Sequence, residues 1–407
     1  NSLFYDDPVH LVRGEGVWLF GPDGERYLDC YNNVPCVGHC HPRVVEALCK
    51  QAGTLNTHTR YLNENILDYG EALLARFDDS LDRVALACTG SEANDLALRM
   101  ARCNTGGSGF ICTDATYHGN TTAVSQLNAE YEPIGGREDN IRLVPWPDAY
   151  RPIAELPEEE LADAYAEEVR KAIESLERAG IKLAGMIACP IFANEGLPST
   201  PAGYLDKAIA HVRDAGGLYI ADEVQSGFGR TGRWWGHLDN GPVPDIVTLG
   251  KPMGAGHPIS GVISRAGLND NYRQYERYFN TYGGNPVSCA VAHEVLRVID
   301  DEGLVENAAE VGQYVLQGLV DLRSRHKCIG DVRGNGLFFA IELVRNRETK
   351  EPDANEANRV VNAMRHKGIL MSRIGVHDNV LKLRPPLCFS KQNADLLIGT
   401  LDAVLGP

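Results

Sequence analysis

Four short segments of the sequence carry side chains that could do chemistry, and each lies at or just after a short apolar run. Residues 89–94 combine small and polar side chains at the start of a helical pattern, where unpaired N–H groups can hold a phosphate. Residues 117–119, Tyr-His-Gly, could place an aromatic ring over a flat ligand. Residues 222–225 and Lys251 add carboxylates and an amine. Because open α/β sheets bind ligands at the carboxyl ends of their strands, we expect these groups to share one site.

Lys251 is the candidate nucleophile. It directly follows the apolar run 245–250 and precedes the glycine-containing stretch 252–256. A desolvated amine loses its preference for the charged form and can form a Schiff base. Each segment alone has an ordinary structural explanation, as a helix cap, a surface turn, a solvated acidic turn or an exposed lysine. Together they supply a phosphate cradle, a stacking ring, a carboxylate and an amine, which are the groups that pyridoxal phosphate requires.

The elements that would position these groups follow an α/β pattern. Between residues 83 and 265, short apolar runs alternate with amphipathic stretches, which is typical of a parallel sheet flanked by helices. Strands are predicted at 83–88, 110–113, 183–188, 218–221 and 246–249. A helix is predicted after residue 91 and another across 158–178. The stretch 131–150, which contains several prolines and glycines, is predicted to be a long ordered loop.

The two ends of the chain differ from this middle part. They are rich in charge and mix helices with short strands such as 337–344. We therefore expect a large cofactor-binding domain of residues 61–290 with a mostly parallel sheet. Residues 1–60 and 291–407 would together form a smaller α+β domain.

Charge and composition narrow the class of partner. The chain has 39 Lys and Arg against 55 Asp and Glu, a net charge of −16, which disfavours nucleic acid and anionic membrane surfaces. No run approaches the roughly 18 to 20 apolar residues of a membrane-spanning helix. The acidic opening lacks the pattern of a signal peptide, and the 11 scattered cysteines resemble reduced thiols. We expect a cytoplasmic protein with a small-molecule partner.

Two other patterns suggest different ligands. Residues 227–232 fit GxGxxG, the fingerprint of a dinucleotide site, but Trp234 and Trp235 follow where a helix would be required. Four neighbouring residues could suggest zinc, although their spacing does not match the usual ligand pairs. They are Cys36, His39, Cys40 and His41. We expect neither a dinucleotide nor a metal.

The four chemical segments, in this order, resemble the class III aminotransferases of the pyridoxal-phosphate fold type I superfamily. The resemblance covers residues 14–389, and 222–225 and 250–251 are its most diagnostic pieces. It implies an α/β fold and a homodimer whose active sites lie at the interface.

The resemblance also implies a role for each side chain around the cofactor ring. Lys251 would hold the cofactor covalently and then move protons at the substrate carbon. Asp222 would pair with the pyridinium nitrogen. Val224 and Tyr117 would pack on the two ring faces, and Gln225 would contact the ring hydroxyl.

The cofactor phosphate would be bound from two subunits. By resemblance, Gly90 and Ser91 contact it within one chain. Residues 279–286 match the family segment whose threonine, here Thr281, reaches the phosphate of the partner subunit.

The sequence departs from the family where aminotransferases bind their substrates. Many members carry an arginine near the C-terminus that grips a carboxylate, and that position aligns with Lys382. A glutamate that pairs with this arginine aligns with Asn194, although Glu195 is adjacent. A lysine cannot reproduce the planar two-pronged grip of an arginine. The sequence therefore lacks the residues with which many family members bind glutamate and 2-oxoglutarate.

Within the family, the chain resembles most closely the ethanolamine-phosphate phospho-lyases and their hydroxylysine-phosphate relatives. The matching segments are 27–34, 55–62, 250–254 and 279–289. This resemblance implies a carbon–oxygen lyase that converts O-phosphoethanolamine, or a related phosphorylated amine, to acetaldehyde, ammonia and phosphate. The alternative is a retained ω-amine or amino-acid:2-oxo acid aminotransferase.

A phospho-lyase must bind the substrate phosphate while charge develops on its bridging oxygen, which calls for cations or N–H donors placed in advance. The candidates are Arg60 and Lys382, with Asn33 as a hydrogen-bond donor and Arg384 ranked below them. Each has a structural alternative: Arg60 could bridge subunits, Lys382 could be a charge at a strand edge, and Asn33 could cap a turn.

Overall fold

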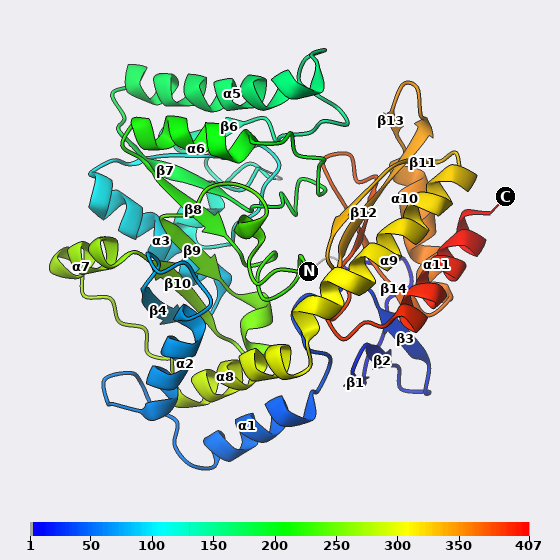
Figure 1. Cartoon of the computed structure of the whole chain (residues 1–407), viewed down its shortest axis with the longest axis horizontal. Helices are drawn as coiled ribbons and strands as arrows, with labels where there is room; N and C mark the ends of the chain where they lie inside the picture. The colour runs from blue at the N-terminus through cyan, green and yellow to red at the C-terminus, as the bar shows by residue number, and fades with distance from the viewer. Residues whose placement is uncertain (1–2, 130, 407) are drawn as a thin grey trace.

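A seven-stranded sheet forms the centre of the larger part of the molecule (Figure 1). The structure is a computed structural model that describes residues 3–129 and 131–406. The strands are β4 (Arg83–Ala87), β5 (Gly109–Thr113), β6 (Ile141–Val144), β7 (Leu183–Ala188), β8 (Leu218–Asp222), β9 (Ile246–Leu249) and β10 (Ser260–Ser264). Their order is β4-β10-β9-β8-β7-β5-β6, with β10 antiparallel to both neighbours and the other pairs parallel. The predicted α/β class with a mostly parallel sheet is confirmed.

Helices cover both faces of this sheet. α3 (Gly90–Thr105) packs on one face, where its apolar side chains share a core with Ile220 of β8. α5 (Glu158–Arg178) and α6 (Tyr204–Asp214) share the other core with Tyr219, whose side chain points the opposite way along the same strand. Since both faces are covered, the strands read as continuous apolar runs, and all six residues of β7 are buried.

The stretch 131–150 is not entirely a loop, so that prediction was wrong for β6. This strand pairs in parallel with β5, with Ile141 opposite Phe110. Its four residues, Ile-Arg-Leu-Val, lie between Asn140 and a proline-containing segment. So short an apolar run carries little periodicity, and its pairing with β5 at the edge of the sheet makes it a strand.

Two further sheets combine residues from distant parts of the chain. The first contains β1 (Arg13–Glu15), β2 (Trp18–Phe20), β3 (Arg26–Asp29) and β14 (Ile369–Leu370). The second contains β11 (Ile329–Asn335), β12 (Phe338–Asn346), β13 (Glu351–Pro352), β15 (Ser372–Ile374) and β16 (Val380–Leu383). The helices α9 (Leu304–Arg325), α10 (Ala354–His366) and α11 (Lys391–Leu405) lie alongside them in Figure 1. The pairing of β3 with β14 joins the two ends of the chain in one sheet.

The remaining helices are α1 (Pro42–Ala52), α2 (Glu64–Leu74), α4 (Thr122–Ser125), α7 (Ala266–Tyr275) and α8 (Pro286–Asp301). α8 packs against both α1 and α2 at the lower edge of Figure 1. The division into domains at residues 61 and 290 stays a prediction, and α8 runs across the second of these positions.

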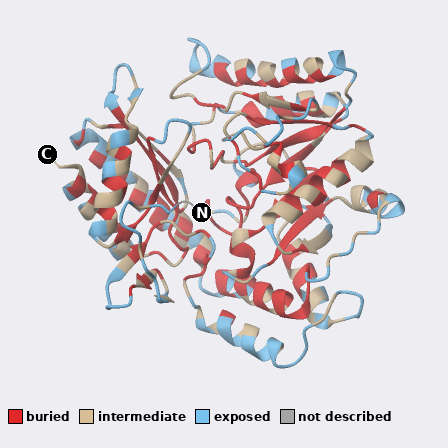
Figure 2. Cartoon of the chain, turned by 180° about the vertical axis from the view of Figure 1, so that it is seen from behind, coloured by how far each residue is buried: buried red, intermediate tan, exposed pale blue. Residues whose placement is uncertain are grey.

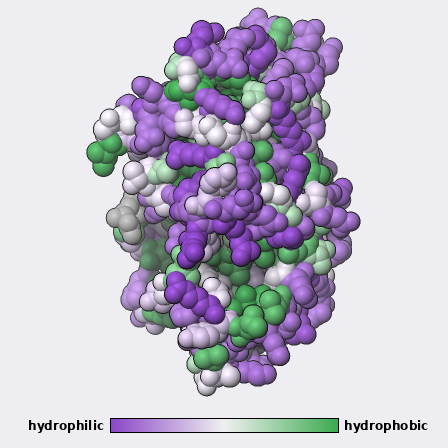
Figure 3. Space-filling view, turned by 90° about the vertical axis from the view of Figure 1, so that its left-hand side faces the viewer, coloured by the Kyte–Doolittle hydropathy of each residue, from purple (hydrophilic) through white to green (hydrophobic). Residues whose placement is uncertain are grey.

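Figure 2 shows that the buried residues follow the strands of the sheets and the inner sides of the helices. The face that carries α7 is mostly hydrophilic, with hydrophobic residues gathered in its lower part (Figure 3). None of the helices in the described ranges combines the length and apolar character needed to cross a bilayer. A cytoplasmic location stays a prediction.

Candidate active site

A pocket at the carboxyl ends of the central strands brings together all of the residues predicted to contact the cofactor except Thr281. Its lining residues are Gly90, Ser91, Tyr117, His118, Gly119, Cys189, Asn194, Asp222, Val224, Gln225 and Lys251. Asp222 ends β8 and Lys251 lies two residues after the end of β9, so the parallel sheet delivers carboxylate and amine to the same edge.

The first wall of this pocket is the start of α3. Thr89 caps the helix by accepting a hydrogen bond from the backbone N–H of Glu92, whose side chain in turn accepts from the N–H of Thr89. A Cβ atom at Gly90 would lie 3.2 Å from the methyl carbons of Val224, and one at Gly119 would lie 2.6 Å from Ser91 Oγ. The absence of a side chain at these glycines therefore lets Val224 and Ser91 pack closely against the backbone beside the N-terminus of α3, which is where a phosphate can bind.

Asp222 is held by a network that the sequence did not reveal. Its Oδ2 lies 2.7 Å from His118 Nδ1 and 3.0 Å from Asn94 Nδ2, and its Oδ1 accepts from the N–H of Val224 at 3.0 Å. Burial by itself raises the pKa of Asp222, but the hydrogen bond from His118 and the other donors outweigh it and hold the pKa below its usual value. An ionised carboxylate facing the pocket suits a protonated pyridine nitrogen.

Lys251 occupies an unusual backbone position. Its φ is +30°, in the left-handed region that residues other than glycine seldom adopt. Such conformations persist where the surrounding structure enforces them, often at functional sites. Burial, and then the nearby positive charge of Arg384, lower the pKa of Lys251, while Asp222 raises it. The lowered pKa makes the neutral amine, which is the nucleophilic form, easier to reach than in an ordinary lysine.

Glu223, next to Asp222, has a structural task. Its buried carboxylate accepts from Ser226 Oγ and from the N–H groups of Gly236 at 2.9 Å and His237 at 2.8 Å. These hydrogen bonds hold residues 236–237, which follow the glycine loop 227–232, against β8. Just before them, Trp235 stacks on Phe77 with ring centroids 4.1 Å apart. This loop is packed into the core and opens no long helix, so its arrangement does not favour the dinucleotide alternative.

Two cations converge on the side chain of Gln225. Arg384 donates a hydrogen bond to Gln225 Oε1, and Lys382 Nζ lies 3.3 Å from the same oxygen. The amide nitrogen of Gln225 donates to Asn194 Oδ1 at 3.0 Å. Lys382 and Arg384 are two residues apart at the end of β16, so their side chains point to the same side.

This cation pair has no carboxylate partner among the described residues: neither side chain takes part in an ion pair, although both are about 95% buried. Burial, and then mutual repulsion with Arg384 and Lys251, hold the pKa of Lys382 well below its usual value, and burial lowers the pKa of Arg384. Glu195 is close enough for its charge to raise the pKa of Lys382, but its carboxylate bonds Thr113 Oγ1 and the N–H of Asn194 and forms no ion pair with the lysine. Uncompensated buried charge is costly, so the arrangement suits an anionic ligand.

The other predicted substrate-binding residues lie differently from what the sequence suggested. Asn33 is buried with its amide engaged: Nδ2 donates to the carbonyl of Gln225 and Oδ1 accepts from Arg230 Nε, both at 2.9 Å. Arg60 is exposed and lies 4.0 Å from the ring centroid of Phe279, outside the Lys251 pocket. Arg384, ranked below both in the sequence, contacts a pocket residue directly.

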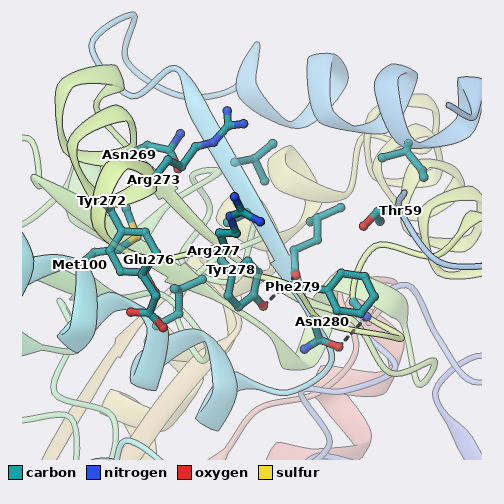
Figure 4. Close-up of a pocket in the computed structure, with 16 residues that line it drawn as sticks. Thr59, Met100, Asn269, Tyr272, Arg273, Glu276, Arg277, Tyr278, Phe279 and Asn280 are labelled. Carbon is teal, nitrogen blue, oxygen red and sulfur yellow. Dashed lines mark hydrogen bonds between the residues drawn. The ribbon is translucent and has the colours of Figure 1, made fainter. Parts of the chain in front are cut away.

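Arg60 and Thr281 adjoin a second pocket, shown in Figure 4 with Thr59 and Phe279 at one end and Arg273 toward the other. Asn280 links this pocket to the first one, since its Nδ2 donates to Glu92 Oε1 at 3.2 Å and Glu92 belongs to the cap of α3. The role of Thr281 at a partner's cofactor stays a prediction.

The four residues whose types could suggest a zinc site are not arranged around a common centre. His39 Nε2 lies 2.6 Å from Asp29 Oδ2, and His41 Nε2 lies 2.9 Å from Glu302 Oε1. In the described part of the chain, no group of three or more His, Cys, Asp or Glu side chains is arranged to hold a metal ion.

The sheet, Lys251 after β9 and Asp222 at the end of β8 are the features on which the resemblance was based, and a comparison with family models tests it. The model for aminotransferase class-III matches residues 5–405. The chain belongs to this family, whose members are pyridoxal-phosphate-dependent enzymes.

Relatives within the family carry two kinds of name. The chain is 41% identical to an alanine–glyoxylate aminotransferase 2-like protein of Drosophila melanogaster, covering 97% of this chain and 82% of that protein. It is 39% identical to ethanolamine-phosphate phospho-lyase homolog 1 of Caenorhabditis elegans, covering 99% and 90%. A solved phospholyase from Arthrobacter, in complex with phosphoethanolamine, is 44% identical with a TM-score of 0.97, covering 100% and 96%.

Proposed function

We propose that the protein is a pyridoxal-phosphate-dependent phospho-lyase that eliminates phosphate from a small phosphorylated amine, with O-phosphoethanolamine as the preferred candidate. The observation that carries this proposal is the buried pair Lys382 and Arg384, which contacts the neutral amide of Gln225, whose other end bonds Asn194. A phosphate ester carries the negative charge that would balance these two cations. The likeness to the Arthrobacter phospholyase and the nematode phospho-lyase homolog supports the same reaction.

The pocket is suited to the cofactor in its donor groups and in its shape. Gly90 and Ser91 at the start of α3 would bind its phosphate, and Asp222 would hold a proton on its ring nitrogen. Val224 and Tyr117 would confine the ring between them. When bound, pyridoxal phosphate supplies an electron sink that stabilises negative charge on the substrate carbon next to nitrogen.

The reaction then depends on a base and on a phosphate site. Lys251 would remove a proton from the substrate carbon that bears nitrogen. The bond from the next carbon to the phosphate oxygen would break, with phosphate taking the electron pair. Arg384 and Lys382 would bind the phosphate group and balance its charge in the bound substrate as well as while it leaves. With one water consumed, O-phosphoethanolamine yields acetaldehyde, ammonia and phosphate.

An aminotransferase is the second candidate, and Arg384 is the observation that favours it. The sequence lacks an arginine at position 382, but the structure places one two residues further on, in contact with Gln225. A guanidinium there offers the two-pronged grip on a carboxylate that Lys382 cannot provide. The name of the Drosophila relative points the same way.

One experiment separates the two candidates. Protein loaded with pyridoxal phosphate is given O-phosphoethanolamine or phosphohydroxylysine without any 2-oxo acid, and phosphate and aldehyde are measured. We expect equal amounts of both products over many turnovers. No phosphate release from either compound, together with nitrogen transfer to a 2-oxo acid, would establish the aminotransferase instead.

We also propose that the protein is a homodimer with active sites at the interface. Large apolar side chains are exposed in the segment that carries Thr281, where Tyr282 is 72% exposed, and in the segment 58–62, where Leu62 is 94% exposed and His58 contacts Phe279. Burying such side chains in a partner would stabilise a dimer. Light scattering should give twice the mass of the chain, and Thr281→Ala should weaken cofactor binding without changing that mass.

A further inference from the structure

We propose that Tyr31 is a positioning residue that holds Arg384 against Gln225, with the N-terminal segment, residues 3–12, as its outer support. The inference rests on the proposed function, because it concerns the arginine assigned to the substrate phosphate. It gives a task to a residue that lies outside the lining of the Lys251 pocket.

Tyr31 contacts Arg384 through both its backbone and its ring. Arg384 Nε donates to the carbonyl oxygen of Tyr31 at 3.1 Å, and the guanidinium carbon lies 4.9 Å from the centroid of the Tyr31 ring. The opposite end of the same guanidinium donates to Gln225 Oε1. A buried guanidinium over an aromatic ring gains a cation–π attraction. Tyr31 therefore fixes the direction of Arg384 without neutralising its charge.

Tyr31 is itself held by Asp29, the last residue of β3. Asp29 Oδ1 accepts from the N–H groups of Tyr31 and Asn32, both at 2.9 Å. The other oxygen of this buried carboxylate lies 2.6 Å from His39 Nε2. The histidine that the sequence offered as a zinc ligand thus braces the turn that carries Tyr31.

The N-terminal segment contacts Tyr31 through an aromatic ring. The ring of Phe4 lies 4.8 Å from the ring of Tyr31, centroid to centroid. The hydroxyl of Tyr5 donates to the carbonyl of Met371 at 2.9 Å and accepts from the N–H of Met371 at 3.1 Å, which ties the segment to the other end of the chain. Contacts therefore run without a break from Phe4 through Tyr31 and Arg384 to Gln225.

The test compares Tyr31→Leu with Tyr31→Phe, which keeps the aromatic ring, and with Tyr27→Leu, which removes a nearby tyrosine of β3 that does not touch Arg384. Phosphate release from O-phosphoethanolamine is measured with each loaded enzyme, and inorganic phosphate is used as an inhibitor. For Tyr31→Leu we expect KM and the inhibition constant of phosphate to rise about tenfold, which corresponds to about 1.4 kcal/mol, with kcat within twofold of wild type. Tyr31→Phe should restore most of the affinity, and Tyr27→Leu should resemble wild type.

The possible results separate this inference from the proposed function. Wild-type release of phosphate with an unchanged KM in Tyr31→Leu overturns the role of Tyr31 and leaves the phospho-lyase in place. A parallel loss of kcat and thermal stability in both Tyr31 variants would also overturn it, because that is the behaviour of a merely structural residue. If wild type releases no phosphate, the proposed function fails, and a crystal structure of Tyr31→Leu decides the inference: Arg384 turned away from Gln225 supports it, and Arg384 unmoved overturns it.

Discussion

Replacing Asn194 with glutamate would add a carboxylate beside the two buried cations of the site. Asn194 Oδ1 lies 3.0 Å from Gln225 Nε2, and the opposite end of that amide meets Lys382 and Arg384. A glutamate is one methylene longer than asparagine, so its carboxylate would displace the Gln225 amide and pair with the cations. The cation pair would then be neutralised before any substrate arrives.

The expected size of this effect follows from the distances. Two unit charges about 4 Å apart attract by about 4 kcal/mol at an effective dielectric constant of about 20. Desolvation of the new carboxylate and loss of the Gln225 contacts reduce the gain. We expect a net effect of about 2–3 kcal/mol, as for hydrogen bonds between charged groups. Affinity for O-phosphoethanolamine should therefore fall by a factor of about 30 to 150.

Steady-state phosphate release measures this loss. Asn194→Glu should raise KM by that factor with a much smaller change in kcat. Asn194→Gln is the matched control, because it adds the same methylene without the charge, and its KM should stay within about threefold of wild type. Equal KM values in the two variants, with thermal unfolding unchanged, would refute the assignment of Lys382 and Arg384 as the phosphate site.

Three further predictions concern the catalytic groups. Lys251→Ala should lose turnover by at least about 1,000-fold while its thermal unfolding stays near that of wild type, and measurable multiple turnovers in that variant would remove Lys251 as the base. Because the base must be neutral, kcat should rise with pH through the lowered pKa of Lys251. Arg384→Leu removes a positive neighbour of Lys251, so the rising part of the pH profile should move to higher pH. An unchanged pH profile in this variant would contradict the electrostatic coupling between Arg384 and Lys251. His118→Phe removes a hydrogen bond to Asp222, so the pKa of Asp222 should rise and cofactor affinity, followed by equilibrium dialysis, should fall about tenfold; unchanged affinity would count against the network.

Much of the fold could be predicted from the sequence because its signals are local. The run that became β7 is apolar throughout and that of β9 has only Thr248 among apolar residues, as expected of strands buried on both faces, and the predicted bounds match the structure. Lys251 and the 222–225 segment could be recognised because each follows such a run. β6 was not predicted because the hydrophobic pattern of four residues at the edge of a sheet is too weak to identify a strand.

The candidate site could be predicted only in part from the sequence, because its contacts join residues that are far apart in the chain. His118 was noted in the sequence only as part of a Tyr-His-Gly turn, and nothing local shows that it reaches Asp222, 104 residues further along the chain. Sequence proximity alone also left Glu195 open as a substitute for the family glutamate, and only the packed structure turns its carboxylate toward Thr113.

The sequence by itself determined the α/β pattern and seven of the residues that line the Lys251 pocket, since both depend on side chains within a few positions of a strand end. Which cations reach Gln225 was decided by the tertiary structure. Arg60 and Arg384 are chemically alike, but β16 points Arg384 into the buried junction and Tyr31 supports it there, while Arg60 lies exposed against Phe279. The charge of a side chain follows from its residue type, whereas its partners and its burial depend on contacts between residues that are hundreds of positions apart.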